Sequence, residues 1–230
     1  MTTTHDSTTG TNHSGTDTIG IIGAGNIGSA LARALTSAGH RVVIANSRGV
    51  ASLAPLVDEL GELATAGTVE QAARAGDLVV VTIPLVAVAS IPRNLLDGRV
   101  VIDTNNYYPS RDGNIAELDD ETLTTAEYVA RHFAGSTVVK AFNHIPALDI
   151  ADHAQPANTA GRRALMVHGD DAVAVERVSA LIDEIGFDAV AGGGLAESWR
   201  IQRDTPGYGP RFTATELHEK LDQAQRYRDQ

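Results

Sequence analysis

The sequence contains no cysteine, no long apolar run and comparatively little positive charge. Without cysteine the chain can form no disulfide, no thiolate zinc site and no cysteine nucleophile, which is typical of a cytoplasmic protein. No apolar run approaches the roughly 18 residues of a membrane span, so we expect a soluble chain. The chain has 18 Lys and Arg residues and 29 Asp and Glu residues, and the resulting net charge of −11 argues against a nucleic-acid partner.

Further absences narrow the possible functions. Residues 1–17 have neither the basic nor the apolar region of a signal peptide, so we interpret them as a disordered leader. The histidines show no H-x-x-x-H spacing, so we expect no metal site. The chain also lacks a G-x-S-x-G nucleophile motif. Its 230 residues are enough for one large α/β domain with a small appendage.

A glycine-rich turn between a strand and a helix is the strongest motif in the chain. Ile19, Ile21 and Ile22 form a short apolar strand, and a helical pattern begins after Gly25. The residues 23–28 between them read G-x-G-x-x-G, in which the glycines permit a tight turn, a close approach of pyrophosphate and close helix packing. The alternative is a glycine-rich turn without a ligand. The strand-turn-helix context favours a dinucleotide site.

The end of the second strand indicates which dinucleotide is bound. The strand expected at residues 41–45 ends in Asn46-Ser47-Arg48-Gly49, where an NAD enzyme usually has Asp or Glu for the ribose hydroxyls. Ser47 can donate a hydrogen bond to a 2′-phosphate, and Arg48 can pair with it as a charged fork. A solvated loop arginine is the alternative interpretation. The absence of an acid at this point favours NADP.

Alternating strands and helices predict a doubly wound parallel sheet of the Rossmann type, with helices on both faces and right-handed crossovers. We expect strands near residues 63–65, 77–83, 99–103, 137–142, 164–168 and 187–190. Helices are expected at 51–60, 69–75, 86–96, 125–133, 171–185, 195–203 and 214–227. The predicted organisation is a disordered leader at 1–17, an NADP-binding domain at 18–203 and a short helical extension at 204–230.

In such a sheet the ligand binds outside the carboxyl ends of the strands. Ile83 and Pro84 would form an apolar wall for the nicotinamide, or they would simply end the strand. His144 follows a strand that ends at the crevice, so both a structural role and a catalytic role are possible for it. The predicted cofactor-binding residues are Gly23, Ala24, Gly25, Asn26, Ile27, Gly28, Ser47, Arg48, Ile83, Pro84, Asn105 and Ala141, and the predicted substrate-binding residues are Asn143, His144 and Tyr107.

Several segments together resemble the family of deazaflavin (coenzyme F420)-dependent NADP oxidoreductases. The similarity rests on residues 19–28, Asn46-Ser-Arg-Gly49, Val81-Thr-Ile-Pro84, Lys140-Ala-Phe-Asn-His-Ile-Pro146 and His168-Gly-Asp-Asp171. The chain is also similar to the reductase domain of the six-transmembrane metalloreductases. The resemblance implies hydride transfer between NADP(H) and a deazaflavin or flavin stacked on the nicotinamide. It would place residues 24–27, Ser47, Arg48, Ile83, Pro84 and Ala141 around NADP.

The chain departs from the family pattern in the segments that would shape the acceptor pocket, which are residues 105–109 and those after Pro206. We therefore carry three hypotheses: a reductase of a deazaflavin or flavin, a reductase of a small carbonyl or imine in which His144 or Tyr107 supplies the proton, and a non-catalytic NADP-binding sensor. The expected partner is a small-molecule hydride acceptor or donor, with neither nucleic acid nor membrane, and a homodimer is the candidate assembly.

Overall fold

The computed structural model describes residues 17–226, and the remaining residues, 1–16 and 227–230, lie outside the described part. The predicted disordered leader therefore falls outside it, except for Asp17. The carboxylate of Asp17 pairs with Arg177 at 3.2 Å, and its carbonyl oxygen accepts a hydrogen bond from the N–H of Arg41 at 3.0 Å. Within the described part, no helix combines the length and the apolar character that a membrane crossing needs.

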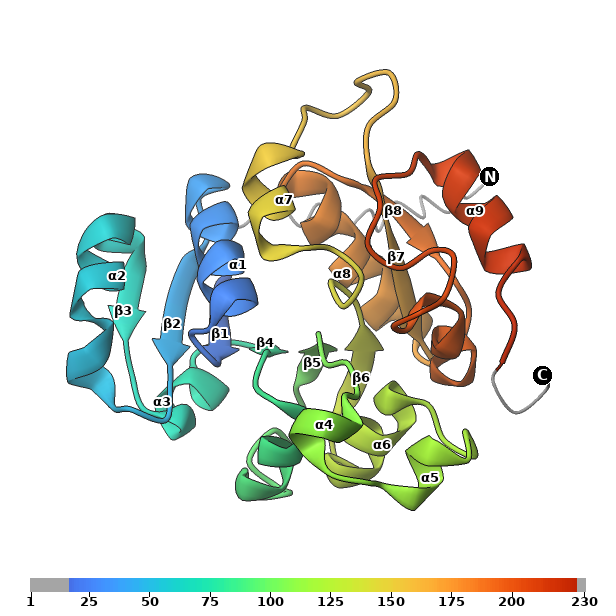
Figure 1. Cartoon of the computed structure of the whole chain (residues 1–230). Helices are drawn as coiled ribbons and strands as arrows, with labels where there is room; N and C mark the ends of the chain where they lie inside the picture. The colour runs from blue at the N-terminus through green and yellow to red at the C-terminus, as the bar shows by residue number, and fades with distance from the viewer. Residues whose placement is uncertain (1–16, 227–230) are drawn as a thin grey trace, which may run out of the picture.

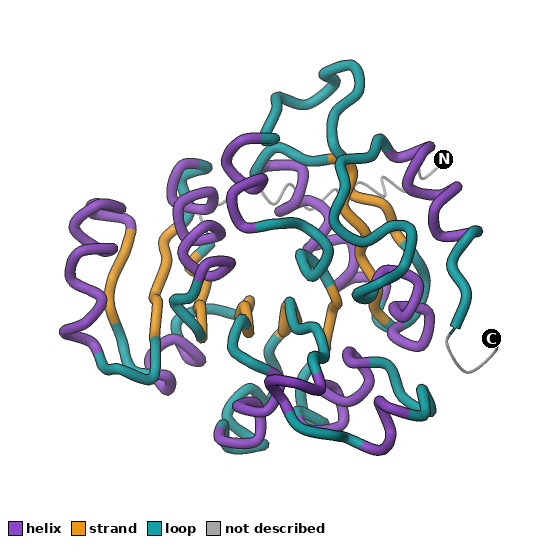
Figure 2. Tube along the Cα trace, viewed as in Figure 1, coloured by secondary structure: helices purple, strands orange, loops and turns teal. Residues whose placement is uncertain are grey.

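An eight-stranded sheet runs through the molecule in the order β3-β2-β1-β4-β5-β6-β7-β8 (Figures 1 and 2). Neighbouring strands are parallel, except that β6 and β7 are antiparallel. The order reverses between β1 and β4, which is the switch point of a doubly wound sheet, so the predicted fold class is confirmed. The strands are β1 (Thr18–Ile22), β2 (Arg41–Ala45), β3 (Ala64–Ala66), β4 (Leu78–Val81), β5 (Val100–Asp103), β6 (Thr137–Lys140), β7 (Ala164–Gly169) and β8 (Asp188–Ala191).

Helices cover both faces of this sheet, as the sequence predicted (Figure 1). One core cluster joins the sheet to α1 (Asn26–Ser37), α2 (Ala54–Leu60), α7 (Ala147–Asp152) and α8 (Ala172–Glu184). The opposite face is covered by α3 (Val69–Arg74), α5 (Ala116–Asp119), α6 (Thr125–His132) and the 3₁₀ helices η3 (Leu85–Ser90) and η4 (Leu195–Ile201). A smaller cluster packs α9 (Ala214–Asp222) against β7 and β8. The remaining short elements are η1 (Val50–Leu53), η2 (Gly61–Leu63) and α4 (Pro109–Asp112).

The central strands are buried on both sides. Ile19 and Ile21 of β1 pack into the cluster beneath α1, whereas Ile22 packs into the cluster on the opposite face. Because successive side chains of a strand point to opposite faces, a strand covered on both sides needs an apolar residue at nearly every position. Continuous apolar runs such as Leu78–Val81 therefore predicted strands correctly.

The structure differs from the sequence prediction in several places, and the helix expected at residues 195–203 is the 3₁₀ helix η4. The helix expected at residues 86–96 is the 3₁₀ helix η3, which ends at Ser90 because Pro92 disfavours a helical conformation of Ile91. The short helices α4, α5 and α7 were not predicted. β7 runs antiparallel to β6. The helix between them, α7, has only six residues and is about 9 Å long. The connection therefore stays near the carboxyl end of β6 and does not cross the sheet.

Candidate active site

The glycine-rich turn after β1 has a geometry that only glycine can adopt. Gly23 has φ +117°, and a Cβ on it would lie 2.3 Å from the carbonyl oxygen of Thr82. A Cβ on Gly28 would lie 1.9 Å from the carbonyl oxygen of Gly23. Gly28 therefore brings α1 against the turn after β1, and Gly23 brings that turn against the residue after β4. Such close packing is what a dinucleotide-binding turn requires.

Gly25 serves a different purpose. Its φ of −81° is accessible to any residue, and a Cβ there would meet no atom within 4 Å. It precedes the 12-residue helix α1, whose first turn contains no acidic residue. Unpaired N–H groups and the positive end of the helix dipole favour an anion at this point. Gly25 thus exposes bare backbone where a pyrophosphate would lie.

The turn after β2 exposes a serine and an arginine. The side-chain oxygen of Asn46 accepts a hydrogen bond from the backbone N–H of Arg48 at 3.0 Å, and its amide nitrogen bonds Ser52 at 2.9 Å. Asn46 therefore shapes the turn and leaves Ser47 and Arg48 exposed. Within residues 17–226 the Arg48 guanidinium has no ion-pair partner, whereas Arg33, which lines a neighbouring cleft, pairs with Glu59 at 2.6 Å. Arg48 is thus available to an external anion.

A cleft of about 430 Å³ brings most of the predicted cofactor residues together. The predicted residues that line it are Gly23, Ala24, Gly25, Ser47, Arg48, Ile83 and Pro84. Its apolar wall also includes Val69, Ala87 and Ile91, which sequence reasoning missed because they lie on two separate short segments. Asn26 lines the adjoining larger cleft, and Ile27 packs against the core.

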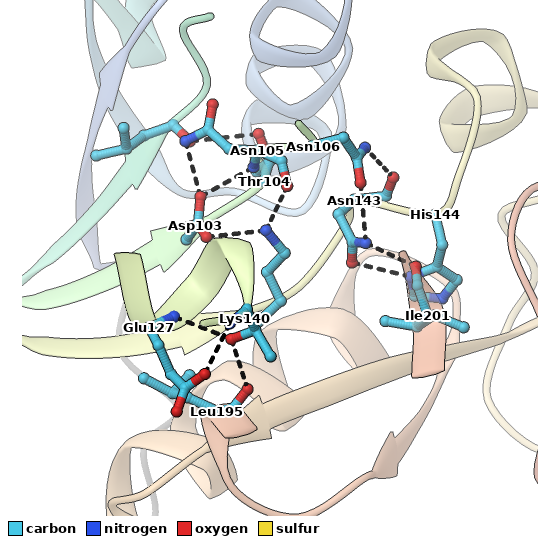
Figure 3. Close-up of polar contacts among 12 residues, drawn as sticks. Asp103, Thr104, Asn105, Asn106, Glu127, Lys140, Asn143, His144, Leu195 and Ile201 are labelled. Carbon is cyan, nitrogen blue, oxygen red and sulfur yellow. Dashed lines mark hydrogen bonds and ion pairs between the residues drawn. The ribbon is translucent and has the colours of Figure 1, made fainter. Parts of the chain in front are cut away.

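Asn105 and Ala141 are buried at the carboxyl ends of β5 and β6. Asn105 is held by the ion pair of Asp103 and Lys140, which was not predicted (Figure 3). The Lys140 ammonium donates to Asp103 at 2.9 Å and to the carbonyl oxygen of Asn105, while Asp103 accepts from the backbone and side-chain nitrogens of Asn105 at 2.9 and 2.8 Å. Burial lowers the pKa of Lys140, and the charge of Asp103 opposes that shift. The pair fixes the loop that follows β5.

His144 and Asn143 are also buried, and both serve the scaffold. The backbone N–H of Met166 donates to Nε2 of His144 at 3.1 Å, which assigns the ring proton to Nδ1, 3.3 Å from the side-chain oxygen of Asn143. Burial, followed by the charge of Arg163, lowers the pKa of His144 to about 3. Asn143 donates to the carbonyl oxygen of Ile201 at 2.9 Å. This geometry argues against a substrate-binding role for His144 and supports the structural alternative.

Tyr107 lies in another cavity than the predicted cofactor residues. Its hydroxyl is 2.6 Å from the carboxylate of Asp119 and 3.0 Å from the carbonyl oxygen of Gly113, and it accepts from the N–H of Ile115 at 3.0 Å. The ring lines a separate cavity of about 170 Å³ together with Trp199. The predicted substrate residue Tyr107 is therefore committed to the packing of α5.

Asp112 connects the cofactor cleft to the loop after β5, although nothing in its sequence context signalled this. Its buried carboxylate accepts from the N–H of Val86, two residues beyond the cleft residue Pro84, at 3.3 Å and from the N–H of Tyr108 at 2.9 Å. Burial raises its pKa, but the Arg111 guanidinium and these two N–H groups outweigh it, so the pKa lies below its usual range. Asp112 thus ties the backbone of Tyr108 to the segment that follows β4 and lines the cleft.

Comparisons with known proteins identify relatives of this chain. Residues 18–107 match the family model described as NADP oxidoreductase, coenzyme F420-dependent. The hypothetical protein SMa0349 of Sinorhizobium meliloti is 36% identical, with a TM-score of 0.70 over 83% of this chain and 91% of that one. The structure of a protein described as an F420-dependent NADP reductase of an Arthrobacter species shows the same fold, with 23% identity and a TM-score of 0.67 over 80% of this chain and 87% of that one.

A curated relative supports the second resemblance seen in the sequence. The metalloreductase STEAP3 of Rattus norvegicus is 28% identical over 188 residues, which are 80% of this chain and 35% of STEAP3. The chain spans less than half the length of the curated relatives that it matches. From the family model and the extended match to the Sinorhizobium protein, the chain belongs to the NADP-dependent oxidoreductases of the coenzyme F420-dependent family.

Proposed function

We propose that this protein transfers a hydride between NADP(H) and a deazaflavin or flavin ring stacked on the nicotinamide. The observation that carries the proposal is the cleft after β1, β2 and β4, where bare backbone at Gly25, the unpaired guanidinium of Arg48 and an apolar wall line one surface. These are the groups that a pyrophosphate, a 2′-phosphate and a nicotinamide ring require.

Each part of the cleft has a distinct role in this proposal. Gly25 and the start of α1 bind the pyrophosphate, and Ser47 with Arg48 binds the 2′-phosphate. Ile83 and Pro84 support the nicotinamide and exclude water from one side of it. NADPH supplies the hydride, and the protein supplies the position and the dry surface.

A stacked ring fits this geometry better than a carbonyl or imine whose proton comes from His144 or Tyr107. His144 is buried with a pKa of about 3, so it carries no transferable acidic proton near neutral pH. The Tyr107 hydroxyl is held by Asp119 and Gly113, away from the cleft. Hydride transfer between stacked rings depends mainly on alignment and exclusion of water.

The test measures NADPH oxidation by the purified protein with coenzyme F420, with free flavin mononucleotide and with a panel of carbonyls and imines. We expect reduction of one of the two rings and little reaction with the panel. Turnover with the panel alone would support the carbonyl or imine reductase, and NADPH binding without any turnover would support the sensor. A homodimer and a cytoplasmic location remain predictions, which sedimentation and fractionation can check.

A further inference from the structure

Two tyrosine hydroxyls meet at the carboxyl ends of β5 and β6. Tyr108 precedes α4, and Tyr208 lies in the loop between η4 and α9. Their hydroxyl oxygens are 3.0 Å apart, and both side chains are half-buried. The contact joins segments that lie 100 residues apart.

Both tyrosines are anchored to the site. On the cofactor side, Asp112 accepts hydrogen bonds from the N–H of Tyr108 and the N–H of Val86, which lies between the cleft residues Pro84 and Ala87. On the β6 side, the amide nitrogen of Asn106 donates to the carbonyl oxygen of Asn143 at 2.7 Å and reaches the Tyr208 hydroxyl at 3.4 Å. Figure 3 shows Asn106 facing Asn143 across this edge. The pair therefore joins the loop after β5, which Asp112 ties to the cleft segment, to the region after β6.

One hydroxyl proton of this pair is not used in the hydrogen bond between the two tyrosines. Two hydroxyls carry two protons, and only one of them can lie in the bond between the two oxygens. Because Asn106 donates to Tyr208, it consumes an acceptor site there and takes up no proton. Within residues 17–226, no acceptor is hydrogen-bonded to the second proton.

The surroundings favour the protonated Tyr208 hydroxyl and hold the Tyr108 ring in place. Burial, together with the hydrogen bond that Tyr208 shares with Tyr108, raises the pKa of Tyr208 above its usual value. The guanidinium groups of Arg111 and Arg203 lie 4.8 and 5.4 Å from the centre of the Tyr108 ring. Such cation–π contacts hold the ring and place positive charge nearby.

We propose that the Tyr108–Tyr208 pair donates a hydrogen bond to a carbonyl oxygen or ring nitrogen of the hydride acceptor, which makes the two tyrosines acceptor-binding residues. This assignment rests on the proposed function. Hydride transfer breaks a C–H bond of NADPH, forms a bond from hydrogen to the acceptor ring, oxidises the cofactor and reduces the ring. The electron pair gained by the ring is delocalised onto the heteroatom that the tyrosine contacts, and a solvent proton completes the reduction.

The substitutions Tyr108→Phe and Tyr208→Phe test the assignment. Tyr128→Phe on α6 is the matched control, because Tyr128 is also half-buried with an arginine, Arg131, 5.5 Å from its ring centre. The dissociation constants of coenzyme F420 and of flavin mononucleotide are measured in the presence of saturating NADP⁺, together with kcat and KM for their reduction by NADPH. Thermal unfolding shows whether each variant folds.

We expect Tyr108→Phe to weaken binding of the ring by about fivefold to twentyfold while the affinity for NADP⁺ stays unchanged. Tyr208→Phe should weaken ring binding by a similar factor, because each hydroxyl orients the other. Tyr128→Phe should change nothing.

Unchanged ring binding and reduction by Tyr108→Phe would overturn the assignment and leave the proposed function standing. If the unmutated protein binds NADP⁺ but neither binds nor reduces either ring, the proposed acceptor class fails and the assignment fails with it. A weaker affinity for NADP⁺ in Tyr108→Phe would also contradict the assignment, since it would place the tyrosine on the cofactor.

Discussion

The two halves of the sheet's carboxyl edge are built in different ways. At β1, β2 and β4, a cleft is lined by bare backbone, by apolar side chains and by Arg48, which has no ion-pair partner in the described part of the chain. At β5 and β6, polar side chains are buried and hydrogen-bonded within the protein. Lys140 forms an ion pair with Asp103, and Asn143 donates a hydrogen bond to the carbonyl oxygen of Ile201. The cofactor half thus keeps its groups available to a ligand, whereas the other half uses its polar groups to fix the loops after β5 and β6.

The largest effect is expected at the buried pair. Lys140→Met leaves Asp103 as an uncompensated buried carboxylate, which should lower the free energy of unfolding by about 3–5 kcal/mol. The matched control is Arg33→Met, which breaks the half-exposed pair with Glu59 and should cost about 0–1 kcal/mol. Urea unfolding at pH 7 measures both. Equal losses would show that the two halves do not differ in this respect.

Gly25→Ala should separate binding from folding. The φ of Gly25 suits alanine and a Cβ there meets no atom within 4 Å, so the melting temperature should stay nearly constant. The methyl group would stand where the pyrophosphate approaches, so the affinity for NADPH should fall by about a hundredfold, on the order of 2.7 kcal/mol.

Gly28→Ala is the comparison for that variant, because its Cβ would lie 1.9 Å from the carbonyl oxygen of Gly23. It should lose stability as well as affinity. Tight NADPH binding by Gly25→Ala would contradict the role given to this turn.

His168 should make the β6–β7 side sensitive to acid. It is fully buried, its ring nitrogens form no hydrogen bond within the described residues, and burial, then Lys140, lowers its pKa to about 4. The unfolded chain, with a histidine pKa of about 6.5, therefore binds a proton that the folded chain does not. The stability contributed by neutral His168 is present above about pH 6.5 and is lost as the pH falls toward 4.

His168→Leu should therefore lose about 2 kcal/mol less stability than the unmutated protein between pH 7 and pH 5. The control substitution is His218→Gln, at an exposed histidine on α9. Urea titrations at the two pH values decide the matter, and a parallel acid loss in His168→Leu would show that this histidine is not the acid-sensitive group.

The smallest effect is expected in the pH dependence of turnover. Because the pKa of His144 is about 3 and its Nε2 accepts the N–H of Met166, this residue should not titrate during catalysis above pH 6. The rate profiles of His144→Gln and of the unmutated protein should therefore have the same shape between pH 6 and pH 9. Loss of a titration step in the variant would restore the role of proton donor to His144.

The same contrast explains what the sequence could predict. Gly23, Gly25 and Gly28 form one contiguous motif, and Ser47 with Arg48 directly follows a strand, so the cofactor half was readable from local pattern. The Asp103–Lys140 pair and the contact between Tyr108 and Tyr208 join residues 37 and 100 positions apart. Such contacts depend on the tertiary arrangement of strands and loops, for which a single sequence gives no local signal.

The direction of β7 illustrates the same limit for the fold. Its apolar run predicted a strand correctly, but its antiparallel pairing depends on where the loop after β6 leads the chain. Within that loop, α7 is only six residues long. Strand identity was local information, and strand direction was not.

The most direct test of the account is the preference between NADPH and NADH, measured as two dissociation constants by calorimetry. If Ser47 and Arg48 bind the 2′-phosphate, the unmutated protein should prefer NADPH by ~1–3 kcal/mol, and Arg48→Ala should remove most of that preference. Arg41→Ala is the control, because Arg41 is an exposed arginine at the opposite end of the same strand. Equal affinities for NADPH and NADH in the unmutated protein would contradict the account.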